Sequence, residues 1–126
     1  MLNRKIENEL KTTADEYPVI TVIGPRQSGK TTLVRKFFRD HTYVNLENPE
    51  LRSLALDDPK TFMRRYPAPV IFDEIQNVPE LLSWIQVIVD ENPDLIGGYI
   101  LTGSHQLQLR EAITQSLAGR TALLTL

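Results

Sequence analysis

Cysteine is absent from the 126-residue sequence, which excludes disulfides, thiolate zinc sites and a cysteine nucleophile. No apolar run approaches the roughly 20 residues that a bilayer-spanning helix needs, and residues 1–7 contain no apolar signal core. Neither sign of charge dominates, and a net charge of −2 argues against a protein that binds nucleic acid over its whole surface. We therefore expect a cytoplasmic protein without a membrane partner.

The sequence does contain enough apolar residues for one folded domain. Hydrophobic residues make up 41% of it and charged residues 24%, a composition that excludes a disordered chain and fits a single core. The last residues, 121–126, are apolar and β-prone and include no terminating signal. This ending predicts that residues 1–126 are one domain, truncated at its C-terminal end, of a longer protein.

Short apolar runs alternate with amphipathic segments along the chain. Strands are expected at 19–23, 42–46, 69–74 and 98–102 and from 121 onward. Helices are expected in the first dozen residues, where Leu2, Ile6 and Leu10 recur, and at about 31–39, 50–56, 60–65, 81–89 and 109–117. Strands that alternate with helices predict an α/β fold, with a mostly parallel sheet covered by helices on both faces.

Capping residues mark several helix ends. Asn48 and Asp58 each precede a proline, which is a signal for a helix start. Asn77 with Glu80 three residues later predicts a capping pair for the helix at 81–89. Gly119 has the position of a C-terminal cap after the helix at 109–117.

The segment GPRQSGKT at 24–31 matches the phosphate-binding pattern G-x-x-x-x-G-K-[ST]. It follows an expected buried strand and opens an expected helix, so that loop amides and the helix N-terminus can face one anion. Lys30 would neutralise the outer phosphates, and the Thr31 hydroxyl would ligate Mg²⁺. Arg26 either contacts a phosphate or faces solvent. The predicted nucleotide contacts are Gly24, Pro25, Arg26, Gln27, Ser28, Gly29, Lys30, Thr31 and Thr32.

The strand at 69–74 ends in two carboxylates, Asp73 and Glu74. Ligands of open α/β sheets collect at such strand ends. Asp73 lies 43 positions after Lys30 and would hold Mg²⁺, directly or through water. Glu74 would orient or deprotonate the attacking water. An ordinary solvated strand end is the alternative, and Gln76 either contacts the nucleotide or caps a turn.

Polar residues also follow the strand at 98–102. Thr102 or Ser104 would lie beside the γ-phosphate and the attacking water, or the strand simply ends there; no role is assigned to His105. Arg120 follows Gly119, and its planar guanidinium suits a phosphate or a carboxylate. It is a candidate catalytic arginine for its own site or that of a neighbouring copy, or else it fixes the helix end through a salt bridge.

Four sequence blocks together resemble the prokaryotic AAA-domain ATPases of the archaeal-ATPase-like group. They are GPRQSGKTTL at 24–33, DEIQ with PELL at 73–82, LTGS at 101–104 and SLAGR at 116–120. The resemblance implies a three-layer P-loop NTPase fold of the additional-strand class. It also implies Lys30 and Thr31 at the phosphates and Mg²⁺, Asp73 at Mg²⁺ and Glu74 as the catalytic carboxylate. Ser28 and His105 depart from the group, which commonly has valine and a small polar residue there.

The expected function is Mg²⁺-dependent ATP binding and hydrolysis that moves an attached or partner domain, with Glu74, Lys30 and Arg120 as catalytic residues. The resemblance implies a C-terminal domain beyond this chain, and a homo-oligomer would be needed if Arg120 acts on a neighbour. The alternative is a nucleotide-gated interaction module with little turnover. A GTPase is disfavoured because no Asn-Lys-x-Asp sequence is present. Nucleic acid is conceivable only for the full protein, because the basic clusters at 35–39 and 64–65 are small.

Overall fold

A computed structural model describes residues 4–126, so the expected contribution of Leu2 lies outside the described residues. The helices are α1 (Arg4–Ala14), α2 (Lys30–Phe37), α3 (Pro49–Asp57), α4 (Pro59–Arg65), the 3₁₀ helix η1 (Ile75–Asn77), α5 (Leu81–Glu91) and α6 (Leu107–Leu117). The strands are β1 (Val19–Ile23), β2 (Thr42–Asn45), β3 (Val70–Asp73), β4 (Tyr99–Gly103) and β5 (Thr121–Thr125). Each expected strand and helix is confirmed within a few residues of its expected bounds.

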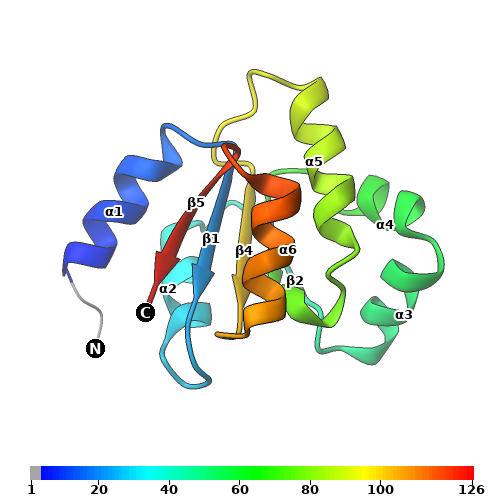
Figure 1. Ribbon diagram of the computed structural model, residues 1–126, viewed down its shortest axis with the longest axis horizontal. Coiled ribbons are helices and arrows are strands. Elements are labelled where there is room, and N and C mark those ends of the chain that lie inside the picture. The colour runs from blue at the N-terminus through cyan, green and yellow to red at the C-terminus, as the bar shows by residue number, and fades with distance from the viewer. Residues whose placement is uncertain (1–3) are drawn as a thin grey trace.

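The five strands form one parallel sheet in the order β2-β3-β4-β1-β5. β4 therefore lies between β1, which leads into the glycine-rich loop, and β3, which ends at the carboxylates. This arrangement confirms the expected additional-strand sheet. All strands run in the same direction, so the residues that follow their C-terminal ends gather at one end of the sheet (Figure 1).

Helices cover both faces of the sheet because the strand side chains alternate between two apolar clusters. Ile20 and Val22 of β1 pack with Leu10 of α1 and Leu33 of α2 on one face. Val19 and its neighbours on the other face pack against residues of α3, α4, α5 and α6. In Figure 1, α6 crosses in front of the sheet and α2 lies behind it. The expected three-layer fold is thus confirmed.

The helix ends follow the capping expectations with one exception. Asn48 Oδ1 accepts from the Glu50 amide at 2.9 Å, and Asp58 Oδ1 accepts from the Thr61 amide at 3.2 Å. Gly119, the second residue after α6, has a φ of 78°, the left-handed conformation that glycine commonly adopts just beyond a helix end. The expectation for Asn77 was wrong: its side-chain amide donates to the Glu74 carbonyl at 3.0 Å, since η1 turns it back toward β3. α5 starts after Glu80 without a side-chain cap.

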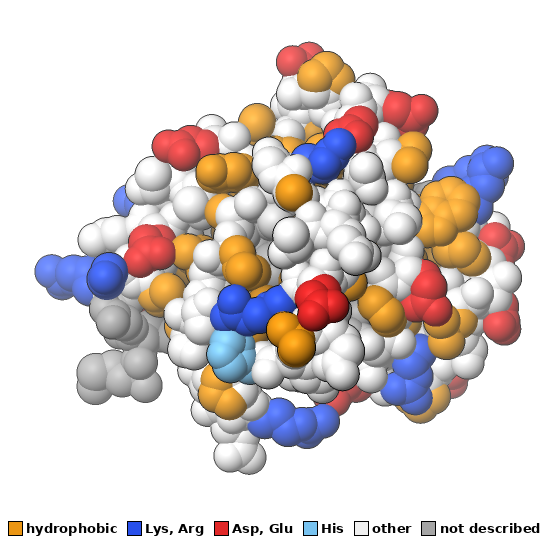
Figure 2. Space-filling view, in the orientation of Figure 1, with side chains coloured by type: hydrophobic (Ala, Val, Ile, Leu, Met, Phe, Trp, Pro, Cys, Tyr) orange, Lys and Arg blue, Asp and Glu red, His pale blue; other side chains and the backbone are white. Residues whose placement is uncertain are grey.

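The surface carries charges of both signs. Basic and acidic side chains are interspersed on the face shown in Figure 2 and form no large basic patch there. No helix within residues 4–126 combines the length and the apolar character that crossing a membrane requires.

Candidate functional site

The loop between β1 and α2 is held in a conformation that few residue types adopt. Gly29, the residue before α2, has a φ of 88°. A side-chain carbon at Gly24 would lie 2.9 Å from Ser28 Oγ, so the loop closes tightly over that glycine. The first residues of α2, whose amides have no partner within the helix, line the space that this loop encloses.

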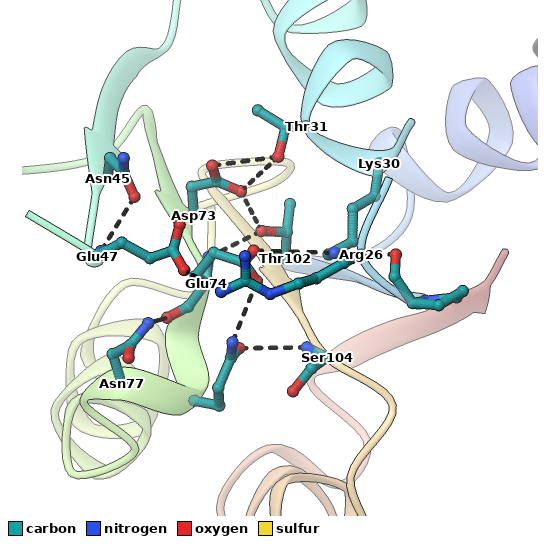
Figure 3. Close-up of polar contacts among 12 residues, drawn as sticks. Arg26, Lys30, Thr31, Asn45, Glu47, Asp73, Glu74, Asn77, Thr102 and Ser104 are labelled. Atoms are coloured by element: carbon teal, nitrogen blue, oxygen red, sulfur yellow. Dashed lines mark hydrogen bonds and ion pairs between the residues drawn. The ribbon is translucent and has the colours of Figure 1, made fainter. Parts of the chain in front are cut away.

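This space is a cavity of about 230 Å³. It is lined by Arg26, Gln27, Gly29, Lys30, Thr31 and Thr32 and, from across the sheet edge, by Glu74. Lys30 is only 4% exposed, and its ammonium lies 3.3 Å from the Pro25 carbonyl oxygen and 3.9 Å from Glu74 Oε2 (Figure 3). The cavity thus brings one buried cation and one buried carboxylate together beside the loop.

Asp73 accepts hydrogen bonds from three hydroxyl groups on three different elements. Thr31 Oγ1 of α2 donates to Oδ1 at 3.0 Å, and Thr102 of β4 donates to the same oxygen (Figure 3). The Tyr43 hydroxyl of β2 donates to Oδ2 at 2.5 Å. Burial, and then the hydrogen bond to Asp73, raise the pKa of Tyr43 above its usual range, as expected for a phenol that donates its proton to a carboxylate.

Glu74 is fixed through both its backbone and its side chain. Its φ of 62° lies in the left-handed region, which is rare for a residue with a side chain and common at functional sites. Its amide donates to Thr102 Oγ1 at 2.9 Å, and its Oε1 accepts from Gln76 Nε2 at 3.2 Å. Gln76 Oε1 accepts in turn from the Ser104 amide at 3.2 Å. Gln76 therefore joins the catalytic candidate Glu74 to the end of β4, a position that neither sequence alternative described.

The two candidates after β4 differ in their hydroxyl partners. The Thr102 hydroxyl is fully buried and already engaged with Asp73 and Glu74. Ser104 Oγ is also buried but has no hydrogen-bond partner within residues 4–126. Of the two, only the Ser104 hydroxyl is without a hydrogen-bond partner in the described part of the chain.

Two arginines predicted for the site are each paired with a carboxylate. Arg26 lines the cavity, but its side chain is 80% exposed and donates to Glu47 Oε2 at 2.8 Å. Arg120 lies at the opposite end of the sheet, where the strands begin. It directly precedes β5, and its carbonyl accepts a hydrogen bond from the amide of Val19, the first residue of β1. Its guanidinium donates to both oxygens of Asp90, at 2.7 and 2.8 Å. The structure thus shows the salt-bridge alternative and does not bring Arg120 to its own chain's cavity.

The donors present suit a hard divalent cation. Within residues 4–126, no three His, Cys, Asp or Glu side chains form a metal cage. The Thr31 hydroxyl and the Asp73 carboxylate instead present oxygen atoms beside the cavity. Mg²⁺ is usually held in this way, by one or two protein oxygens together with substrate phosphates and water.

A sequence model described as AAA domain matches residues 16–126. The chain belongs to the AAA domain family. It is 33% identical over 120 residues to uncharacterized proteins of Mycobacterium bovis and Mycobacterium tuberculosis, covering 93% of this chain. A solved Walker-type ATPase of Pyrococcus abyssi has the same fold, with a TM-score of 0.62 and 20% identity over 99% of this chain and 54% of that one.

The mycobacterial relatives are longer proteins, and this AAA domain spans only 26% of their length. The match to the family and the fold confirm the resemblance to prokaryotic AAA-type ATPases that the sequence blocks indicated. The domain is a nucleotide-binding P-loop domain of the ATPase type.

Sequence reasoning missed Tyr43 as a member of the AAA domain's site. The sequence predicts a strand at 42–46 but does not tell which strand it pairs with. Only the register of β2 against β3, in which Tyr43 pairs with Ile71 and Asn45 with Asp73, shows that the phenol can reach Asp73.

Proposed function

We propose that this AAA domain binds ATP together with Mg²⁺ and hydrolyses the β–γ phosphoanhydride, and that its nucleotide state acts on an attached or partner domain. The observation that carries the proposal is the contact between Thr31 and Asp73 at 3.0 Å, beside a cavity shared by Lys30 and Glu74. Phosphate-binding, metal-binding and proton-accepting groups therefore meet at one place.

In this proposal the loop and the start of α2 bind the phosphates. The residues from Gly24 to Thr32 other than Pro25 would supply backbone N–H groups, and the positive end of the α2 dipole favours an anion at the same point. Lys30 is nearly buried, so its charge acts on a phosphate with little screening by water.

Thr31 and Asp73 would hold the metal ion. When Thr31 donates its proton to Asp73, the lone pairs of its hydroxyl oxygen stay available for a cation. Bound Mg²⁺ would neutralise charge on the β- and γ-phosphates.

Glu74 would accept a proton from the attacking water. Gln76 holds its carboxylate beside the cavity, and the Thr102 hydroxyl holds its backbone amide. A positioned carboxylate in this role contributes about 10²–10⁴-fold to a rate. Ser104 is proposed to contact the terminal phosphate through its unpartnered hydroxyl.

Titration calorimetry with ATP, ADP and GTP, each with and without Mg²⁺, tests this function. We expect adenine nucleotides to bind more tightly with Mg²⁺, and Lys30→Ala to weaken ATP binding about 10- to 100-fold, because hydrogen bonds to charged groups contribute about 1.5–3 kcal/mol. Lys36→Ala is the matched control, since Lys36 lies exposed on the same helix. Equal ATP affinity for Lys30→Ala and the wild type would overturn the proposal.

A nucleotide-gated interaction module with little turnover is the second candidate. The position of Arg120 favours it, because this guanidinium is paired with Asp90 at the edge of the sheet away from the cavity. Arg120 is proposed to act on the site of a neighbouring copy. ATP hydrolysis whose specific activity rises steeply with protein concentration would support that assembly, and tight binding without turnover at any concentration would support the module.

A further inference from the structure

The hydrogen bond between Tyr43 and Asp73 depends on how two neighbouring strands are aligned. Tyr43 of β2 pairs with Ile71 of β3, and Asp73 lies two residues further along β3. Side chains two residues apart on a strand share one face, so Asp73 is the diagonal neighbour of Tyr43 on the face that α2 covers. A long aromatic side chain spans such a diagonal, and the phenol oxygen lies 2.5 Å from Asp73 Oδ2.

The Tyr43 ring is also held from the side of α2. The guanidinium carbon of Arg35 lies 4.1 Å from the centre of the ring, a cation–π contact. Thr31 also lies on α2 and donates its hydroxyl to Asp73. It precedes Arg35 by four residues and lies one turn nearer the cavity. α2 therefore positions Asp73 twice, once directly through Thr31 and once through the ring that Arg35 covers.

The three donors divide the Asp73 carboxylate between them. Thr102 and Thr31 donate to Oδ1, while Tyr43 is the nearest donor to Oδ2, with Thr31 at 3.2 Å. A carboxylate with both oxygens held has one orientation, so it presents its remaining lone pairs in fixed directions. Partners that orient a ligating group in this way strongly affect how well a metal is bound.

We propose that Tyr43 is a positioning residue for the metal site: its hydroxyl fixes Asp73 in the orientation that favours a divalent cation beside the nucleotide phosphates. This inference rests on the proposed function, since it presupposes that Asp73 helps to hold Mg²⁺. Tyr43 does not line the phosphate cavity, so it acts only through Asp73 and leaves metal-free nucleotide binding unaffected.

A purely structural role for the same bond leads to a different expectation. The bond also ties the edge strand β2 to β3, and that alone would lower stability when it is lost. It would not change the ratio of nucleotide affinities with and without Mg²⁺. This ratio is therefore the decisive measurement.

The test compares wild type with Tyr43→Phe, which removes only the hydroxyl. Titration calorimetry uses an ATP analogue with a non-hydrolysable β–γ linkage, in the presence of Mg²⁺ and in the presence of EDTA. We expect the ratio of the affinity in Mg²⁺ to the affinity in EDTA to be about 10-fold smaller for Tyr43→Phe than for wild type. The affinity in EDTA itself should stay within about twofold of wild type. Tyr66→Phe is the matched control, because that ring packs on Phe62 on the opposite face of the sheet.

Each result decides the question. A Mg²⁺-dependent gain equal in wild type and Tyr43→Phe overturns the role of Tyr43 while the proposed function stands. A variant that also loses affinity in EDTA overturns it as well, because the hydroxyl then acts on more than the metal. A wild type that binds the analogue no better with Mg²⁺ removes the metal site, and with it both this inference and the Mg²⁺ dependence of the proposed function.

Discussion

Glu74→Gln is the substitution that most directly separates nucleotide binding from hydrolysis. Glutamine has the shape of glutamate and still offers an oxygen to Gln76 Nε2, which lies 3.2 Å from Glu74 Oε1. It cannot accept a proton at neutral pH. The left-handed backbone at residue 74 and the bond from its amide to Thr102 do not depend on the side-chain charge. The substitution should therefore remove the proposed base and leave its surroundings in place.

The size of the effect follows from what Glu74 contacts. Loss of a general base costs about 10²–10⁴-fold in rate, or about 3–5 kcal/mol in the activation barrier. Glu74 Oε2 also lies 3.9 Å from the Lys30 ammonium, a gross attraction of about 4 kcal/mol at an effective dielectric constant of about 20. When the carboxylate is neutralised, Lys30 becomes freer to pair with a phosphate. We therefore expect ATP to bind at least as tightly as it does to wild type.

Phosphate release at saturating Mg²⁺-ATP measures the rate, and titration calorimetry measures the affinity. Glu80→Gln is a suitable control, because Glu80 is an exposed glutamate just before α5. If Glu74→Gln hydrolyses ATP within about threefold of the wild-type rate, Glu74 is not the base. If it binds ATP much more weakly, Glu74 belongs to the binding site rather than to the chemistry.

Two further predictions concern side chains that support the site and the far edge of the sheet. Thr102→Val should lower the free energy of unfolding by about 2 kcal/mol, because the buried amide of Glu74 and the Asp73 carboxylate both lose a hydrogen-bond partner. Thr102→Ser keeps the hydroxyl and should recover most of this free energy, as measured by denaturant titration. Equal stability of the two variants would contradict the argument. The hydrogen bond from Arg120 lowers the pKa of Asp90 below its usual 3.8, so the pair stabilises the fold above that pH and the stabilisation is lost as the pH falls below it. The difference in Tm between wild type and Asp90→Asn should accordingly shrink on acidification, and a difference independent of pH would show that the pair does not contribute.

The fold could be predicted from the sequence because local signals agree along the chain. Apolar runs of strand length, helical spacing and the caps at Asn48 and Asp58 each act within a few residues. The phosphate loop was equally accessible, since its motif specifies a strand, a tight turn and a helix start. These signals also placed Asp73 and Glu74 at the edge where the loop lies.

The supporting contacts of the site could not be predicted, because they depend on side-chain direction and strand register. Tyr43 reaches Asp73 only through the pairing of β2 with β3. Gln76 reaches Ser104 because η1 lies against the end of β4. The sequence pattern predicted Asn77 as a helix cap, but its side chain donates to the Glu74 carbonyl because the chain makes a 3₁₀ turn before α5 begins. The sequence around Arg120 was compatible with either a catalytic arginine or a salt bridge, and the structure shows the salt bridge with Asp90.

The position of β4 has a consequence for which part of a nucleotide the site can distinguish. Neighbouring strands lie about 4.8 Å apart, so β1 and β3 are separated by about 10 Å across β4. In the proposed function the inner phosphates would rest on the loop after β1, and Glu74, which follows β3, would face the same cavity from beyond β4. In the proposed function, the outermost group of a triphosphate would lie nearest the end of β4, where Gln76 joins Glu74 to Ser104. We therefore expect a diphosphate to occupy the loop without reaching this bridge, so that the position of β4 would let the site respond to the length of the phosphate chain.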